Sequence, residues 1–252
     1  MNLLAFDTGT DAMSVAVART VDGRVQTWQH TAPGGAQTST GLIPAILGLM
    51  ADADLQMTDL DAICFGSGPG SFTGLRTACA VAQGLAFGAH VPVLAIDSLL
   101  AVAEEARHAA LPSQQRGVIT AVLDARMDEL YCATYAFEDG QWTALQSGGL
   151  VRPEDLARCQ GDPAAAPWVM AGNAFAVYGD RVAAADPAAA SAVRIPALPT
   201  ALAMLRLAPA MLAQGKVVAA EHAMPQYVRD KVAKTTAERA AEKASALGEG
   251  AP

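Results

Sequence analysis

The chain has 252 residues, a net charge of −8 and a pI near 4.9, so it is long enough for one large domain or two small ones. Apolar residues make up 52% and charged residues 17%, a composition typical of globular rather than disordered proteins. Nucleic-acid phosphates repel an acidic chain that has no local basic face, which argues against independent, tight RNA binding.

The first half of the chain predicts the element order βββαβαβα. Strands are expected at residues 3–6, 13–18 and 24–31, with the hairpin signal Asp22-Gly23 between the second and the third. A polar turn, residues 7–11, separates the first two strands. The first apolar run ends there without a basic region before it, so we expect no signal peptide. No apolar run is long enough to span a membrane, and we expect a cytoplasmic protein.

Three helices and two further strands complete this first half. A helix is predicted over residues 40–53, with Thr38 or Ser39 as its N-cap. An apolar strand then leads into a glycine-rich loop and a long apolar helix. The strand at residues 91–96 and the helix at 98–109 follow.

The glycine-rich loop at residues 66–76 reads Gly-Ser-Gly-Pro-Gly-Ser-Phe-Thr-Gly-Leu-Arg, with four glycines in its first nine positions. Pro69 and Gly70 fit the centre of a type II turn, and Ser71 or Thr73 fits the N-cap of the next helix. Backbone amides at a helix start bind anions, but the loop lacks the Gly-Lys-Ser/Thr ending of a P-loop. A phosphate cradle and a tight turn without a ligand both stay open. The residues assigned to a structural loop are Gly68, Pro69, Gly70, Ser71, Phe72, Thr73 and Gly74, with Phe72 packing the loop against the helix.

The pattern restarts after a linker at residues 112–115 and then weakens, which predicts a reduced second copy. The expected elements are strands at 118–123, 129–137, 142–150 and 168–171, and helices at 153–159, 178–185 and 200–213. We therefore expect two lobes, residues 1–110 and 117–232, followed by a flexible tail at 233–252. The helix at 200–213 is expected to pack back on the first lobe.

The four cysteines, Cys64, Cys79, Cys132 and Cys159, form no CxxC pair. Two of them lie in apolar runs, so we expect buried, reduced thiols of a cytosolic protein and no metal cluster.

Four motifs in the same order resemble the bacterial TsaB (YeaZ) family: residues 6–8, the glycine-rich loop, residues 124–131 and residues 221–229. The resemblance covers roughly residues 1–232. It implies an actin-like, two-lobed α/β fold whose first lobe is ribonuclease-H-like. It also implies a non-catalytic scaffold subunit needed to form N6-threonylcarbamoyladenosine next to the tRNA anticodon. Such proteins pair with a catalytic paralogue, TsaD, help recruit an ATPase, TsaE, form homodimers in isolation, and meet tRNA only through the complex.

The residues of the expected cleft argue against chemistry by this chain. The catalytic paralogue holds a metal with an HxxxH pair, whereas no two of the four histidines here lie within four residues of each other. Of the two phosphate loops of actin-like kinases, the first is partly kept as Asp7, Thr8 and Gly9. In the second, Asp124 is followed by Ala125 and Arg126, whose side chains would crowd the phosphates. We expect no cofactor and no metal, and a turn-capping role for both aspartates is the favoured alternative to a degenerate nucleotide cleft.

The two helices that flank the loop are apolar on more than one face, although a helix on one side of a sheet needs a single apolar stripe. We hypothesise that they also pack against matching helices of a partner. The residues assigned to this partner interface are Leu42, Ile43, Ile46, Leu49, Met50, Ala78, Val81, Ala82 and Leu85. Coverage by another part of the same chain is the alternative.

Two rival functions stay open. An actin-like small-molecule kinase or phosphotransferase would share the fold. A peptidase is disfavoured by the histidine spacing and because no base is spaced to activate Ser71 as a nucleophile.

Overall fold

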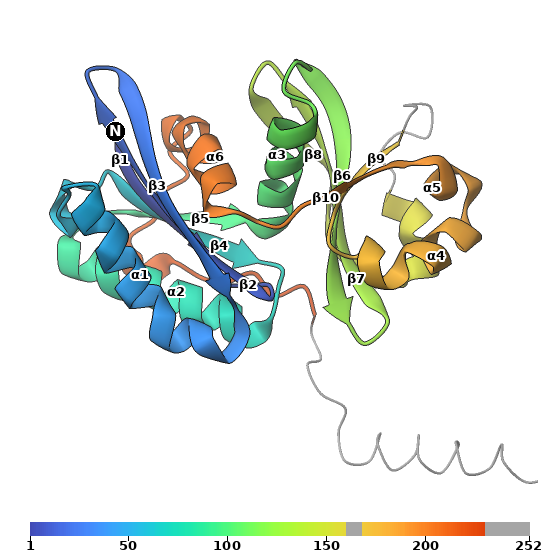
Figure 1. Ribbon diagram of the computed structural model, residues 1–252, viewed down its shortest axis with the longest axis horizontal. Coiled ribbons are helices and arrows are strands. Elements are labelled where there is room, and N and C mark those ends of the chain that lie inside the picture. The colour runs from blue at the N-terminus through green and yellow to red at the C-terminus, as the bar shows by residue number, and fades with distance from the viewer. Residues whose placement is uncertain (160–167, 230–252) are drawn as a thin grey trace, which may run out of the picture.

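The computed structural model describes residues 1–159 and 168–229 (Figure 1). The predicted tail at residues 233–252 lies outside the described residues. Two five-stranded sheets stand side by side, with helices α3 and α6 between them (Figure 1).

The first sheet has the strand order β3-β2-β1-β4-β5. Its strands are β1 (Asn2–Asp7), β2 (Ala12–Val21), β3 (Arg24–Pro33), β4 (Ala62–Gly68) and β5 (Val93–Asp97). Strand β1 pairs antiparallel with β2 and parallel with β4. The predicted hairpin is confirmed, since Asp22 and Gly23 take φ values of 50° and 74° at the turn between β2 and β3.

Helices cover both faces of this sheet. They are α1 (Thr38–Asp52), α2 (Phe72–Ala89), α3 (Ser98–Ala110) and α6 (Ala201–Ala213). Helices α1 and α2 lie next to each other on the face away from the second sheet (Figure 1), where their buried side chains meet those of β1, β2 and β4. Helix α6 packs on the opposite face with β1, β2 and β4, as the sequence predicts for the helix near 200–213.

The second sheet repeats the first, with the order β10-β9-β6-β7-β8. Its strands are β6 (Arg116–Arg126), β7 (Glu129–Glu138), β8 (Gln141–Val151), β9 (Val169–Gly172) and β10 (Val193–Pro196). The helices beside it are α4 (Phe175–Ala185) and α5 (Pro187–Ser191). Short 3-10 helices occur in both halves of the chain: η1 (Gly35–Gln37), η2 (Met57–Asp59), η3 (Pro153–Cys159) and η4 (Ala220–His222). The second sheet has as many strands as the first, so the expected weakening of the second copy is wrong for the sheet. Helix α5 and strand β10 could not be predicted from the sequence because both are short and neither has a clear period.

The expectation of four reduced thiols is wrong for two of them. A disulfide joins Cys132 on β7 to Cys159 at the end of η3, whereas Cys64 and Cys79 are free and buried. The two bonded cysteines are 27 residues apart in sequence, so their proximity depends on tertiary structure.

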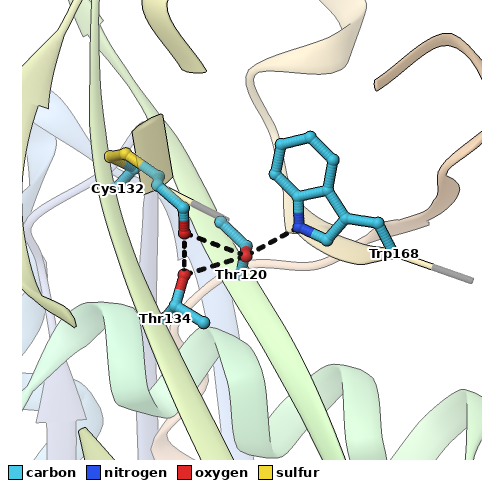
Figure 2. Close-up of a disulfide and its surroundings, with 5 residues drawn as sticks. Thr120, Cys132, Thr134 and Trp168 are labelled. Carbon is cyan, nitrogen blue, oxygen red and sulfur yellow. Dashed lines mark hydrogen bonds between the residues drawn. A yellow bond between two sulfur atoms is a disulfide. The ribbon is translucent and has the colours of Figure 1, made fainter. Parts of the chain in front are cut away.

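Figure 2 shows the buried polar side chains beside this disulfide. The Trp168 Nε1 donates to Thr120 Oγ1 at 2.8 Å, and Thr120 Oγ1 and Thr134 Oγ1 lie 2.9 Å apart. The Thr134 hydroxyl donates to the carbonyl oxygen of Cys159. These bonds satisfy hydroxyl and indole groups that burial removes from water.

The predicted cap of α1 is also wrong. Gln37 occupies the N-cap position without a side-chain hydrogen bond, and Thr38 is the first residue of the helix. The Thr38 hydroxyl is buried and has no hydrogen-bond partner among the described residues.

No helix within residues 1–159 and 168–229 is long and apolar enough to cross a membrane.

Candidate functional site

The glycine-rich loop joins β4 to α2 and packs directly on the turn between β1 and β2. The Ser71 amide donates to the Gly9 carbonyl at 2.7 Å. A Cβ on Gly70 would lie 2.6 Å from the Gly9 carbonyl oxygen, and a Cβ on Gly74 would lie 1.9 Å from that of Thr8. At both positions, the absence of a side chain lets the protein's own backbone approach closely. This favours a tight turn without a ligand rather than a phosphate cradle.

The local geometry of the loop corrects one prediction and confirms another. The type II turn is wrong, because the Gly68–Pro69 peptide bond is cis and the positive φ, 115°, belongs to Gly68. The cap is correct, since Ser71 is the N-cap of α2 and its Oγ accepts from the Gly74 amide at 3.2 Å.

A C-terminal segment, residues 221–229, crosses the loop. The Gln226 amide donates to the Ser67 carbonyl at 2.7 Å. The Tyr227 ring lies 5.2 Å from that of Phe72, and its hydroxyl accepts from Arg76 Nε at 3.1 Å. The Arg76 guanidinium also stacks 3.7 Å above the Phe72 ring. Phe72 thus packs against this segment as well as its own helix, so the loop and the distant 221–229 motif form one packed unit.

Asp7 is buried beneath the turn and does not face the cleft. Its Oδ2 accepts from Ser98 Oγ and its Oδ1 from the Gly9 amide, each at 2.7 Å. Burial raises the pKa of Asp7 from 3.8 to about 6, and the two hydrogen bonds only partly oppose this effect. Thr8 is equally buried, and its hydroxyl donates to the Gly74 carbonyl at 2.7 Å.

Arg126 joins the two lobes across the mouth of the cleft. Its Nη1 lies 3.1 Å from Asp124 Oδ2, and its Nη2 pairs with the Asp11 carboxylate of the first lobe. The hydrogen bond that Arg126 donates to Asp11, with the charges of both carboxylates, raises the pKa of Arg126. Asp124 Oδ1 also accepts from the Arg126 amide at 2.7 Å, as Asp7 does from Gly9. The turn-capping interpretation of both aspartates agrees with these bonds.

The cavity between these groups has a volume of about 210 Å³. Of the residues predicted for a degenerate nucleotide cleft, Gly9 and Asp124 line it, whereas Asp7 and Thr8 do not. The rest of the lining comes from both lobes and the crossing segment, including Asp11, Phe72, Arg126, Asn173, Tyr227 and Arg229. The sequence did not predict Asp11, Asn173 and Arg229 as site residues. The Arg229 guanidinium pairs with Glu129 of the second lobe, and only the 221–229 motif signalled its part in the site.

The predicted partner interface needs correction. Six of its residues are buried in the first lobe's own core: Leu42, Ile46, Leu49, Met50, Ala78 and Ala82. Val81 and Leu85 are half-buried against the same core. Large apolar side chains exposed on the two helices are Ile43 at 44%, Leu47 at 53% and Phe87 at 72%. We call these three the outer apolar residues. The sequence pattern did not separate them from the core because both kinds are apolar.

The four histidines lie apart, on β3, at the C-terminal end of α2, on α3 and in η4. Within the described part of the chain, no group of three or more His, Cys, Asp or Glu residues could hold a metal ion.

Three comparisons place the chain among known proteins. A family model described as TsaD, tRNA N6-adenosine threonylcarbamoyltransferase, matches residues 25–237. The tRNA threonylcarbamoyladenosine biosynthesis protein TsaB of Escherichia coli is 33% identical over 236 residues, covering 92% of this chain and 96% of the relative. The protein of the same description from Haemophilus influenzae is 33% identical over 246 residues, covering 92% and 95%.

Solved structures agree with these sequences. YeaZ from Pseudomonas aeruginosa superposes with a TM-score of 0.76 at 36% identity, covering 90% of this chain and 99% of that one. A second Pseudomonas aeruginosa structure, described as an uncharacterized protein with similarity to peptidase YEAZ, gives a TM-score of 0.77 at 37% identity and the same coverage. The two-lobed actin-like α/β fold expected from the sequence is confirmed.

Proposed function

Because the chain belongs to the TsaB (YeaZ) family, within the wider TsaD-type family, we propose that it is a non-catalytic scaffold subunit of a tRNA threonylcarbamoyltransferase complex. It takes part in tRNA threonylcarbamoyladenosine biosynthesis. The proposal adds that it pairs with a TsaD-like catalytic paralogue, helps recruit a TsaE-like ATPase, and meets tRNA through that complex.

The observation that carries the non-catalytic role is the ion pair across the cleft. Arg126 links Asp124 to Asp11 where the two phosphate loops of an actin-like kinase would face a nucleotide. The space beside Gly70 and Gly74 of the neighbouring loop is occupied by the protein's own backbone. The remaining cavity of about 210 Å³ is smaller than the roughly 300–1,000 Å³ of ordinary small-molecule sites.

The outer apolar residues support the pairing. The apolar surface of Phe87, which is 72% exposed, is removed from water only when another surface covers it. A Phe ring presents about 150–250 Å² to a partner. At about 25 cal/mol per Å², covering the exposed part contributes roughly 3 kcal/mol before the costs of association. One such side chain is therefore enough to change pairing measurably.

The pairing is tested by co-expressing the chain with a tagged TsaD-like paralogue. The double variant Leu47→Glu plus Phe87→Glu is expected to fold normally and to be absent from the purified complex, since both side chains are exposed on α1 and α2. The matched control is Val177→Glu, which charges an equally exposed apolar residue on α4 of the second lobe. Co-purification of the double variant at the level of the control would place the partner surface elsewhere.

The alternative function, a small-molecule kinase or phosphotransferase, is tested by calorimetry with Mg-ATP on the purified chain. The scaffold proposal expects no micromolar binding and no phosphate release. Micromolar binding with turnover on a small hydroxyl substrate would favour the alternative.

A further inference from the structure

A second and larger cavity, of about 580 Å³, lies between the lobes at the other end of the sheets. The first cavity is lined by Tyr131 on β7 and this one by Phe137 on the same strand. Six residues of a strand span about 20 Å, so the two cavities are separate sites. The second volume falls within the roughly 300–1,000 Å³ of small-molecule sites, which often form at domain interfaces.

A buried carboxylate organises the polar wall of this cavity. The Glu104 side chain is 4% exposed, and its Oε1 and Oε2 accept from Arg107 Nη2 and Nε at 2.9 and 2.8 Å. Arg206 Nε donates to the same Oε1 at 2.9 Å, and Trp142 Nε1 to Oε2 at 3.3 Å. These bonds hold two guanidinium groups and an indole ring, from three different elements, in fixed positions at the cavity wall.

The two arginines keep unused donors. Arg206 Nη2 donates to Glu105 Oε2 at 2.6 Å, so Arg107 and Arg206 each donate hydrogen bonds to carboxylates through Nε and Nη2. Among residues 1–159 and 168–229, neither Nη1 has a hydrogen-bond partner, and each guanidinium side chain is 24% exposed. Lys216 lines the same cavity and, in that part of the chain, makes no ion pair. Because Arg107, Arg206 and Lys216 all line the cavity, these donors are the ones available to a ligand there.

The charges and the apolar wall define the ligand. The charges of Arg107 and Arg206 are balanced by Glu104 and Glu105, while Lys216 and Asp139 add one charge of each sign. These charges sum to zero, which disfavours a dianion more than a monoanion, and the N–H donors of the arginines and Lys216 can bind a single carboxylate. The apolar lining, which would cover a flat hydrocarbon body, is Leu100, Phe137, Trp142, Leu207 and Met211.

We propose that this cavity, on the polar wall formed by Arg107, Arg206 and Lys216, binds a small aromatic carboxylate. The carboxylate accepts hydrogen bonds from the free guanidinium edges and the Lys216 ammonium, and its ring packs on Trp142. This site is independent of the proposed scaffold function and needs no partner protein.

The test uses the purified full chain and fluorine NMR with 4-(trifluoromethyl)benzoate as the probe. Its neutral counterpart is 4-(trifluoromethyl)benzyl alcohol. Because charge-assisted hydrogen bonds are lost with the alcohol, the benzoate is expected to bind about ten-fold more tightly. No saturable binding of the benzoate, or equal binding of the alcohol, would overturn the proposal.

Two variants locate the binding. Ala210→Trp fills the cavity from α6 and is expected to abolish binding, while Lys216→Glu is expected to weaken it about ten-fold. Arg24→Glu makes the same charge change in the exposed β2–β3 hairpin and is expected to bind as the unaltered chain does. Thermal unfolding of each variant identifies any loss that comes from misfolding. Binding that persists in folded Ala210→Trp, or that Arg24→Glu weakens as much as Lys216→Glu, would show that the benzoate lies elsewhere.

Discussion

Two neighbouring residues on α1 allow folding and partner binding to be separated. Leu42 is 1% exposed and packs in the first lobe's core, while Ile43 is 44% exposed on the outer face. We predict that Leu42→Glu does not fold and that Ile43→Glu folds but no longer pairs with a TsaD-like partner. The same substitution thus prevents folding at one position and prevents only partner binding at the next.

The magnitudes follow from burial. Truncating a buried leucine costs about 2–5 kcal/mol, and an unpaired buried carboxylate costs several kcal/mol more. Together these approach the roughly 5–15 kcal/mol that stabilises a whole domain. A substitution at an exposed position such as Ile43 changes stability by only about 0.5 kcal/mol.

The assay is thermal unfolding followed by circular dichroism, and then co-purification of the folded variant with the tagged partner. Ile43→Glu is expected to unfold within a few degrees of the unaltered chain and to elute without the partner. Cooperative unfolding of Leu42→Glu at the temperature of the unaltered chain would refute the burial of Leu42 in the core. Full co-elution of folded Ile43→Glu with the partner would refute the assignment of Ile43 to the partner surface.

Three further predictions concern stability. The native pKa of Asp7, about 6 against 3.8, means that the folded chain binds more protons between these pH values. The free energy of unfolding therefore falls by about 2 kcal/mol as pH rises from 4 to 6, and urea titrations should show a shallower fall in Asp7→Asn. Replacing Cys132 and Cys159 by alanine opens a loop with a sequence separation of 27 and should lower the same free energy by about 3–4 kcal/mol, whereas an unchanged urea midpoint would mean that the disulfide contributes nothing. Gly74→Ala brings a Cβ within 1.9 Å of the Thr8 carbonyl oxygen and should lower the melting temperature by several degrees in calorimetry; an unchanged value would refute the close packing of loop and turn.

Much of the fold could be predicted because local signals agreed with the tertiary structure. The hairpin at Asp22 and Gly23 follows from turn chemistry, and Ser71 follows from capping preference. The helix cap at Thr38 could not be predicted in the same way, because Thr38 became the first helical residue and its hydroxyl was buried. Local propensity is a weak guide where the core determines the position of a residue.

The site was less predictable, because its residues meet only through tertiary contacts. Asp7 and Asp124 were recognisable from their motifs, but the ion pair of Arg126 with Asp11 joins residues from two lobes. For the helices, composition indicated too much apolar surface for one sheet, yet it could not separate buried Leu42 from exposed Ile43. That distinction depends on the angle at which α1 lies on its sheet.

We propose that this chain supports a reaction that another subunit performs. Reconstitution from purified components tests this role, with N6-threonylcarbamoyladenosine in tRNA assayed by nucleoside mass spectrometry. The components are this chain, a TsaD-like paralogue, a TsaE-like ATPase, ATP, threonylcarbamoyl-adenylate and unmodified tRNA. We predict that the modified base forms only when the chain and the paralogue are both present, and that Asp7→Asn, if folded, supports it as well as the unaltered chain. Formation of the modified base by this chain without the paralogue would show that the chain is itself catalytic.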